Sequence, residues 1–423
     1  VGRAIAQKRQ MERLAAKPGG KAQMATGPTL FTCRDGITTM PFEVLGKLQL
    51  DVKHINLVVC HDLFDTCEAT RLLFKPLVEK HLGCQVLVFN YPSQAQTRFP
   101  VPTDEEAKHQ APGEVALNNE WMAPKLNELM QHVEGQGEML FSAPFHVLGI
   151  GHGLGIAAAF SSQFGASPRY AQSLRSLVSI NGFASVDAQL AAILTSTMNV
   201  FRSIPENRPD LPVSYFSKFL FSDAYLQRVH PNLALNIHTA VLNPITLDGR
   251  IRLIQAALSM ADTKDMVKRL NVPVIVVQST EDALVNSSNV DPLLETRATS
   301  HLWSHQIEEN GNALGKKGSK LLIDALGKPK GAFVVWVRAG HEIRQEKKNI
   351  LLDLFDLLAL PVEVEHPIVA PESEQQPMKE RLPTSQEQER EVDQSDPPPS
   401  YSSPVTSARS HRSNGSGNAD PSA

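Results

Sequence analysis

The chain has 423 residues, 42% of them hydrophobic, and a formal net charge of −4 at pH 7. That length allows one α/β domain of about 250 to 350 residues with a tail. The charge lacks the basic excess typical of nucleic-acid binding, and no apolar run approaches the roughly 18 residues of a membrane span, so we expect neither a nucleic-acid partner nor a transmembrane segment.

The first 27 residues are basic and poor in acidic side chains. They lack the apolar stretch that a secretory signal needs. We therefore interpret residues 1–27 as a solvated basic arm, and a transit peptide is the alternative interpretation.

Strand and helix patterns alternate from residue 28 to residue 183. Turn residues and apolar runs predict strands at Thr29–Cys33, Thr39–Val44, Leu48–Val52, Ile55–Cys60, Gln85–Phe89, Phe145–Ile150 and Ser176–Asn181. Helical periodicity predicts helices over 67–82, 121–133 and 155–165. Continuous apolar strands are typical of a sheet covered on both faces. The alternation predicts an α/β fold with a mostly parallel central sheet and helices on both faces.

The alternation stops between residues 184 and 268, where a helical pattern is interrupted by five prolines. We interpret 184–268 as an inserted helical lid over the carboxyl ends of the strands. The alternation resumes over residues 269–361, so the core is expected in two parts, 28–183 and 269–361. The elements predicted in the second part are strands Val272–Val277 and Ala332–Val337, a helical stretch over 291–326 and a last helix over 346–359.

Proline, serine, glutamate and glutamine dominate beyond Pro361. Such a segment buries too little apolar area to offset an ordering cost of about 1–2 kcal/mol per residue. We expect residues 362–423 to be a disordered tail. Its P-P-x-Y string, formed by Pro398, Pro399 and Tyr401, is typical of ligands for WW-type grooves, with a plain linker as the alternative.

An apolar strand runs into a glycine-rich turn and a helix near residue 150, which is the setting of the G-x-S-x-G nucleophile motif. The frame Gly151-His152-Gly153-Leu154-Gly155 fits this motif, with Gly153 where the serine is expected. Glycine has no side chain to attack a carbonyl, so acyl-serine chemistry is not expected. The spacing also departs from the G-x-G-x-x-G of dinucleotide sites, and we expect no cofactor.

Over roughly residues 29–360 the chain resembles the α/β-hydrolase superfamily. The resemblance rests on the hairpin Asp35–Gly46, the strand Gln85–Pro92, His61 directly after its strand, and Glu281-Asp282 and Gly340-His341 in the segments that follow theirs. The order nucleophile, acid, histidine is that of the superfamily. It implies a vestigial triad of Gly153, Asp282 and His341, in which Asp282 orients the ring of His341.

The resemblance also implies a ligand-pocket and oxyanion region, which comprises His61, Asp62, Leu63, His152 and Leu154. The superfamily's glycine after His61 is Asp62 here, and an inward-facing carboxylate opposes a developing oxyanion. The superfamily's Pro-Gly-x-Gly turn is replaced by Pro92–Thr97. These departures indicate relaxed catalytic constraint, and His152 is interpreted as a packing residue.

The chain also resembles the N-myc downstream-regulated family of non-catalytic hydrolase-fold proteins at His61-Asp62, Gly149-Ile150-Gly151 and Leu220-Phe221-Ser222. That family generally lacks the triad histidine, whereas His341 is present in this chain. The likeness is therefore one of analogy.

The chain has four cysteines, Cys33, Cys60, Cys67 and Cys84, and none forms a C-x-x-C pair. We expect no metal site, a reducing compartment and a cytoplasmic location. Cys60 is predicted to be a buried small apolar residue. Cys67 has no identifiable partner base, which disfavours a reactive role.

We expect a catalytically inactive α/β-hydrolase-fold protein that acts as a binding or scaffold component of a larger assembly. Protein partners and a small apolar ligand under the lid follow from this expectation. One alternative is an active esterase, lipase or peptidase that uses a water activated by His341 and Asp282, or an unrecognised serine. A small-ligand sensor is the other. The nearby serines, none of which stands on a strand-to-helix turn, are Ser93, Ser142, Ser161 and Ser162.

Overall fold

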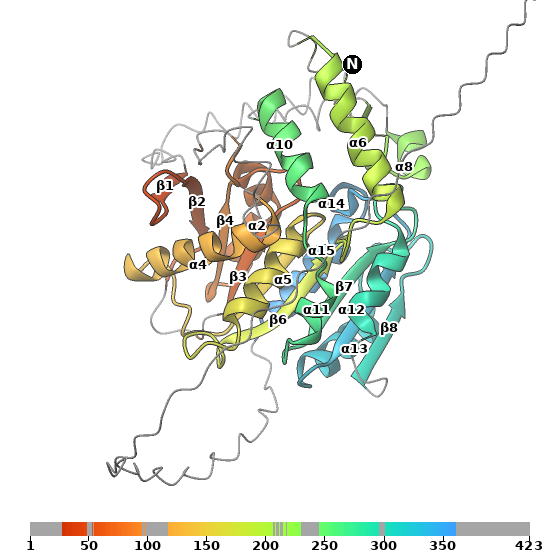
Figure 1. Ribbon diagram of the computed structural model, residues 1–423. Helices are drawn as coiled ribbons and strands as arrows, with labels where there is room; N and C mark the ends of the chain where they lie inside the picture. Colours follow the sequence, from red (N-terminus) through yellow and green to blue (C-terminus); the bar gives the residue numbers. More distant parts are fainter. Residues whose placement is uncertain are drawn as a thin grey trace, which may run out of the picture. The chain divides into compact units, whose positions relative to one another are not determined.

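A nine-stranded sheet runs through the part of the chain that the structure describes (Figure 1). The computed structural model describes residues 28–48, 53, 55–94, 97, 117–205, 208, 211, 215–216, 218–229, 245–295 and 301–360. The strands are β1 (Thr29–Thr32), β2 (Thr39–Leu45), β3 (Ile55–Cys60), β4 (Cys84–Phe89), β5 (Phe145–Ile150), β6 (Leu174–Ile180), β7 (Val274–Ser279), β8 (Leu302–Gln306) and β9 (Ala332–Val337). Their order across the sheet is β1-β2-β4-β3-β5-β6-β7-β9-β8.

The sheet is antiparallel at one edge and parallel through the rest of its width. Strands β1 and β2 pair antiparallel, as do β2 and β4, and every pairing from β4 to β8 is parallel. Parallel strands place their carboxyl ends along one edge, so the loops after β3, β5, β7 and β9 meet there. The predicted α/β class with a mostly parallel sheet is confirmed.

Both faces of the sheet are covered. Successive side chains of a strand point to opposite faces, and β3 accordingly sends Leu57 and Val59 into one hydrophobic cluster and Val58 and Cys60 into the other. The helices that pack on the first of these clusters are α2 (Cys67–Lys80), α13 (Gly315–Leu326) and α15 (Lys348–Leu358). Those on the second are α4 (Asn119–Gly135), α5 (Gly153–Phe164) and α11 (Lys264–Lys268).

Most of the longer helices begin at a capping side chain. Thr66 accepts a hydrogen bond from the Ala69 amide at the start of α2, and Asn118 accepts one from Trp121 at the start of α4. Such caps satisfy amides that have no partner within the helix. Helix α5 differs, because no side chain of its own N-cap residue, His152, caps it. The Leu154 and Gly155 amides donate instead to the Gly151 and His152 carbonyls, at 3.2 and 3.1 Å.

Helices also lie in the described part of the segment that separates β6 from β7. They are α6 (Ala188–Ser203), α8 (Asp223–Arg228), α10 (Leu247–Leu258) and α11. Helices α6 and α10 pack on each other, whereas α11 lies against α5 beside the sheet. Apolar residues of α6 and α10 join the hydrophobic cluster that α4 and α5 form.

One predicted element is wrong. The stretch 291–326, expected to be helical throughout, contains strand β8 between two helical segments: η2 (Ser287–Val290) with α12 (Asp291–Leu294), and α13. β8 is an edge strand, and its residues alternate between exposed and half-buried. It therefore lacks the continuous apolar run that marks the central strands.

Other expectations fall outside the described residues. These include the basic arm 1–27, the strand predicted at Leu48–Val52 apart from Leu48 itself, and the tail 362–423 with its string of Pro398, Pro399 and Tyr401. Chain contacts divide the protein after Pro367, and every described residue belongs to the first unit.

The four cysteines are buried and free of disulfides. Burial raises the pKa of the Cys60 and Cys67 thiols, which opposes formation of a reactive thiolate. Across the described ranges, no helix has the length and apolarity that a bilayer span requires. The same residues contain no group of three or more His, Cys, Asp or Glu side chains placed to hold a metal ion.

Candidate functional site

The sharp turn between β5 and α5 is made by Gly151. Its φ is +51°, whereas Gly153 already lies in helix α5. In the G-x-S-x-G motif, the nucleophile stands on the strained residue of the strand-to-helix turn. The structure thus places the strained residue of this turn at Gly151, two residues before Gly153, with Gly149 and Gly153 as its flanking small residues.

The space around the two glycines differs. A Cβ atom on Gly153 would lie 2.0 Å from the carbonyl oxygen of Cys60, against the backbone of β3. A Cβ atom on Gly151 would instead lie 2.0 Å from Oδ1 of Asp62. Gly153 thus permits close helix–strand packing, and Gly151 faces the cluster of polar side chains. Both positions lack a side chain, so the shift of frame introduces no nucleophile.

The carboxylate of Asp62 lies beside Gly151. Its Oδ1 accepts hydrogen bonds from the Leu63 amide at 2.7 Å and from the His152 amide at 2.9 Å. In this architecture an oxyanion hole is built from the amide that follows the nucleophile and an amide of the loop after β3. With Gly151 as the nucleophile position, these are the amides of His152 and Leu63. A side-chain carboxylate therefore sits on the two oxyanion-binding donors.

The helix geometry favours a negative charge at this point. Aligned peptide dipoles give the N-terminus of α5 a partial positive charge, and the amide of its N-cap residue, His152, points away from the helical hydrogen bonds. Asp62 supplies the missing acceptor. Burial alone raises the pKa of Asp62, but the positive charge of His341 and the hydrogen bonds from His341 and His152 outweigh it and lower that pKa. Asp62 is ionised at neutral pH.

His341 and Asp282 are also brought together. Nδ1 of His341 donates to Oδ2 of Asp282 at 2.7 Å, and Oδ1 of Asp282 accepts from the Leu284 and Val285 amides, each at 2.9 Å. The other ring nitrogen, Nε2, donates to Oδ2 of Asp62 at 2.9 Å. The His341 ring is therefore held between two carboxylates.

This arrangement keeps His341 positively charged. Its side chain is only 2% exposed, and burial by itself lowers the pKa. The carboxylates of Asp282 and Asp62 act in the opposite direction and raise the pKa of His341 well above its ordinary value. A general base needs a free lone pair on Nε2. Here Nε2 carries a proton and donates it to Asp62.

Two residues that sequence reasoning missed anchor the His341 loop. Asn181, with φ +47°, donates to the His341 carbonyl at 2.7 Å and accepts from the Ser279 amide at 2.8 Å. It thereby ties together the ends of β6, β7 and β9. The only sequence signal is an asparagine directly after a strand, a residue type that tolerates left-handed backbone.

Glu346 is the second anchor. Its carboxylate accepts from the Ser222 amide and hydroxyl, at 2.8 and 2.6 Å, and from the Gly340 amide at 3.1 Å. Ser222 caps α8, so Glu346 links the segment between β6 and β7 to the loop that carries His341. Nothing in the local sequence around Glu346 indicated this contact.

The remaining predicted residues pack around the site. His61 donates from Nδ1 to the Asp62 carbonyl at 2.8 Å, and its ring lies 4.1 Å from that of Tyr91, measured between centroids. His152 is 1% exposed, its ring contacts Phe183, and burial lowers its pKa to about 4. Leu154 is fully buried in the core. The two histidines are neutral and take no part in the ion pairs of the site.

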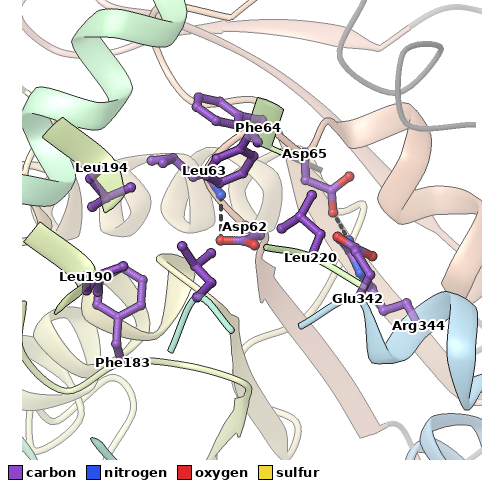
Figure 2. A pocket seen from close by; sticks show the side chains of 12 residues that line it. Asp62, Leu63, Phe64, Asp65, Phe183, Leu190, Leu194, Leu220, Glu342 and Arg344 are labelled. Atoms are coloured by element: carbon purple, nitrogen blue, oxygen red, sulfur yellow. Dashed lines mark hydrogen bonds and ion pairs between the residues drawn. The ribbon is translucent and has the colours of Figure 1, made fainter. Parts of the chain in front are cut away.

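A narrow cavity adjoins the carboxylate of Asp62 (Figure 2). Leu63, Phe183, Leu190 and Leu194 give it an apolar wall, and the space suffices for roughly one or two water molecules. Charged groups lie at another side, where Arg344 pairs with Asp65 and with Glu342. As described, the cavity is far smaller than the roughly 300 Å³ at which pockets for drug-sized ligands begin.

Comparison with known proteins finds similar structures but no similar sequences. The sequence matches no protein-family model and no curated protein. Many solved structures share the fold. One is an α/β-hydrolase enzyme, MGS-M2, from a Medee basin deep-sea metagenome library, which is 15% identical with a TM-score of 0.53 over 78% of this chain and 95% of that chain.

Two further structures agree with this likeness. The enol-lactonase from Burkholderia xenovorans LB400 is 13% identical with a TM-score of 0.54, over 78% of this chain and 100% of that chain. The esterase from Exiguobacterium antarcticum is 13% identical with a TM-score of 0.53, over 78% and 99%. At such identities the likeness defines the architecture of the chain and leaves its activity to be argued from the site.

Proposed function

We propose that this chain, which has the α/β-hydrolase fold, is a catalytically inactive form of that fold and works as a binding or scaffold component of a larger assembly. One observation carries the proposal. The Asp62 carboxylate takes the volume beside Gly151, bonds the two oxyanion-binding amides and engages Nε2 of His341.

Acyl transfer by a serine hydrolase needs a nucleophile, a free general base and an empty oxyanion hole, and this site lacks all three. The nucleophile position has no side chain. The general base is protonated and bonded to Asp62. The amides that would stabilise a developing oxyanion already hold a negative charge, which repels a second one. Loss of any one of these lowers turnover by orders of magnitude, and here all three coincide.

The same contacts weigh against the active-hydrolase alternative. Activation of a water by His341 and Asp282 requires a free Nε2, and that atom donates to Asp62. An unrecognised serine would have to reach His341, yet the hydrogen-bond partners of both its ring nitrogens are carboxylates. The analogy with the N-myc downstream-regulated family, which rests on His61-Asp62 and the glycines near Gly151, favours the inactive form.

The proposal of a scaffold role is based on the sequence of the two terminal segments. The basic segment 1–27 and the proline-rich segment 362–423 offer charge and a P-P-x-Y string for protein partners. Affinity purification of the full chain and of a chain without residues 362–423 tests this role. Partners that are recovered with the full chain and lost with the shorter one support it. Identical recovery by both chains contradicts tail-mediated tethering.

A fluorophosphonate probe tests the absence of acyl-serine chemistry. We expect no labelling of the purified, folded chain beyond that of a heat-denatured sample. Specific labelling that disappears on denaturation would contradict the proposal. Hydrolysis of p-nitrophenyl acetate, compared between the natural chain and the variant His341→Gln, extends the test to chemistry without a serine: equal background rates are expected.

The ligand-sensor alternative is tested by thermal shift against a panel of lipids and hormones. The narrow cavity beside Leu63 favours only small ligands unless α6 moves. An increase in melting temperature that is lost in the cavity variant Leu194→Trp would support a sensor. No stabilisation across the panel counts against it.

A further inference from the structure

We infer that Asp62 is an internal ligand of an otherwise intact ester-hydrolysis site, so that removal of its carboxylate together with a hydroxyl at position 151 is sufficient to confer ester hydrolysis. The inference rests on the proposed function, because it presumes that the natural chain is inactive. It goes further by stating that two positions account for the inactivity.

The oxyanion-binding donors are already in place. The two amides reach Oδ1 of Asp62 at 2.7 and 2.9 Å, within the range of about 2.7–3.1 Å expected from donors to an oxyanion. They belong to Leu63 in the loop after β3 and to His152 in the β5–α5 turn. Both loops follow directly on strands of the sheet, β3 and β5, so we expect both amides to keep their positions without the Asp62 side chain. Removal of the carboxylate therefore leaves an empty anion site.

The nucleophile position is blocked by the same side chain. The three atoms nearest to a Cβ on Gly151 are Oδ1, Cγ and Oδ2 of Asp62, at 2.0, 2.3 and 2.7 Å. No backbone atom is among them. A hydroxyl on that Cβ would therefore take the place of the Asp62 carboxylate, whose Oδ2 lies 2.9 Å from Nε2 of His341.

The acid–base pair needs no rearrangement. Asp282 is fixed by the Leu284 and Val285 amides and holds Nδ1 of His341, while Asn181 holds the His341 carbonyl. Without Asp62, one of the two carboxylates that keep His341 protonated is gone. Its Nε2 then has a lone pair for the introduced hydroxyl.

The reaction that follows balances with no co-reactant other than water. The hydroxyl oxygen bonds to the ester carbonyl carbon, its proton passes to Nε2 of His341, and the carbonyl oxygen takes the negative charge at the amides of Leu63 and His152. The C–O bond to the alcohol then breaks, and His341 returns the proton to the departing alcohol. Water repeats the sequence on the acyl group and releases a carboxylic acid.

The cavity restricts the substrate to short acyl groups. The wall formed by Leu63, Phe183, Leu190 and Leu194 leaves room for roughly one or two water molecules. In the double variant, the loss of three heavy atoms at position 62 is offset in part by the two heavy atoms that serine adds at position 151. We expect the site to favour an acetyl group, whereas a long acyl chain requires movement of α6. We therefore choose p-nitrophenyl acetate as the probe and p-nitrophenyl decanoate as its counterpart.

The experiment compares the natural chain, Asp62→Ala, Gly151→Ser, the double variant Asp62→Ala/Gly151→Ser, and the double variant with His341→Gln. We expect the double variant to be labelled by a fluorophosphonate and to hydrolyse p-nitrophenyl acetate at least about 100-fold faster than either single variant, and the added His341→Gln to remove that gain. A folded double variant with neither activity overturns the inference. Activity of the natural chain would instead overturn the proposed function.

A second measurement covers a double variant that does not fold. The variant Asp62→Ala alone should bind formate at the vacated amides. We expect formate, and not chloride at equal ionic strength, to raise its melting temperature and to shift the amide resonances of Leu63 and His152. The natural chain, whose site is filled, should show neither effect. If the single variant is indifferent to formate, the anion site is not preserved and the inference fails.

Discussion

Nε2 of His341 lies 2.9 Å from Oδ2 of Asp62, although the two residues are 279 positions apart in the chain. The other ring nitrogen donates to Asp282 at 2.7 Å. Both nitrogens act as donors, which only the charged ring can do. Asp62 is thus the hydrogen-bond partner of the nitrogen that, in a serine hydrolase, faces the nucleophile.

Replacement of this partner should weaken both the fold and the charge on the ring. In Asp62→Asn, the new amide N–H faces Nε2 of His341, so the ring must give up its proton to accept from it and the buried ion pair is lost. We expect a loss of about 1–3 kcal/mol in the free energy of unfolding. The pKa of His341 should fall, because one of the two carboxylates that raise it is gone. Denaturant unfolding and NMR titration of the ring measure these effects.

The exposed Asp324, on α13, supplies the matched control. Asp324→Asn should change the free energy of unfolding by less than about 0.5 kcal/mol. An equal loss in both variants would mean that the position of Asp62 has no special energetic role.

The free energy of unfolding should depend on pH because His341 titrates. Its pKa is raised in the folded chain above the ordinary value of 6.5, so the associated stability is fully present below pH 6.5 and is lost as the pH rises toward the folded-state pKa. In that window the free energy of unfolding of the natural chain should fall, relative to His341→Gln, by up to about 1.4 kcal/mol per pH unit.

Asp62 is one of the carboxylates that make stability fall at acid pH, together with Asp35 and Asp356, whose pKa values are also lowered. The pKa of Asp62 is lowered from 3.8, so the stability that it contributes is present above pH 3.8 and is lost progressively below it. Urea unfolding between pH 3 and pH 10 covers both windows. A difference between the natural chain and His341→Gln that stays constant from pH 6.5 to pH 10 would show that the ring is neutral in the folded protein.

The two glycines in the first turn of α5 should respond differently to alanine. A methyl group on Gly153 meets the Cys60 carbonyl oxygen at 2.0 Å, and Cys60 is fixed within the sheet by its pairing with Gly149 of β5. A methyl group on Gly155 meets the flexible end of Met260 instead. We expect Gly153→Ala to cost about 3 kcal/mol or more, and Gly155→Ala to cost less than about 1 kcal/mol because alanine is the better helix former. Thermal and urea unfolding compare the two directly, and a tolerated Gly153→Ala would refute the close packing of α5 on β3.

The anchor Asn181 separates backbone strain from hydrogen bonding. Asn181→Gly relieves the left-handed backbone at φ +47° but removes the bonds to His341 and Ser279. We expect a net loss of about 1–3 kcal/mol and faster hydrogen exchange in the loop after β9. The exposed Asn312 gives the control Asn312→Gly, for which little change is expected. A neutral Asn181→Gly would assign the role of this residue to backbone conformation alone.

The local pattern of apolar residues was sufficient to predict most strands of the sheet. A strand covered on both faces must be apolar at successive positions, and Ile55–Cys60 and Phe145–Ile150 carry that pattern and form β3 and β5. The edge strand β8 carries no such run, because one of its sides is exposed, and it was missed for that reason. Its place in the sheet depends on pairing with β9, which lies about thirty residues further along the chain.

The position of the strand-to-helix turn among the four glycines could not be predicted from the sequence. Gly149, Gly151, Gly153 and Gly155 fit two overlapping G-x-x-x-G frames, and nothing local decides between them. The choice depends on where β5 stops and how closely α5 packs on Cys60. Asp62 was recognised as a departure, but whether it would face inward was left open.

The sequence by itself determined the alternating α/β architecture, the order of Asp282 and His341, and the absence of a side chain at either glycine frame, because these follow from residue type and local periodicity. Only the tertiary structure decided that the turn falls at Gly151 and that Asp62 spans the His152 amide and the His341 ring. Those contacts join segments 90 and 279 residues apart. They exist because parallel strands bring their carboxyl ends to one edge of the sheet, which no short stretch of sequence encodes.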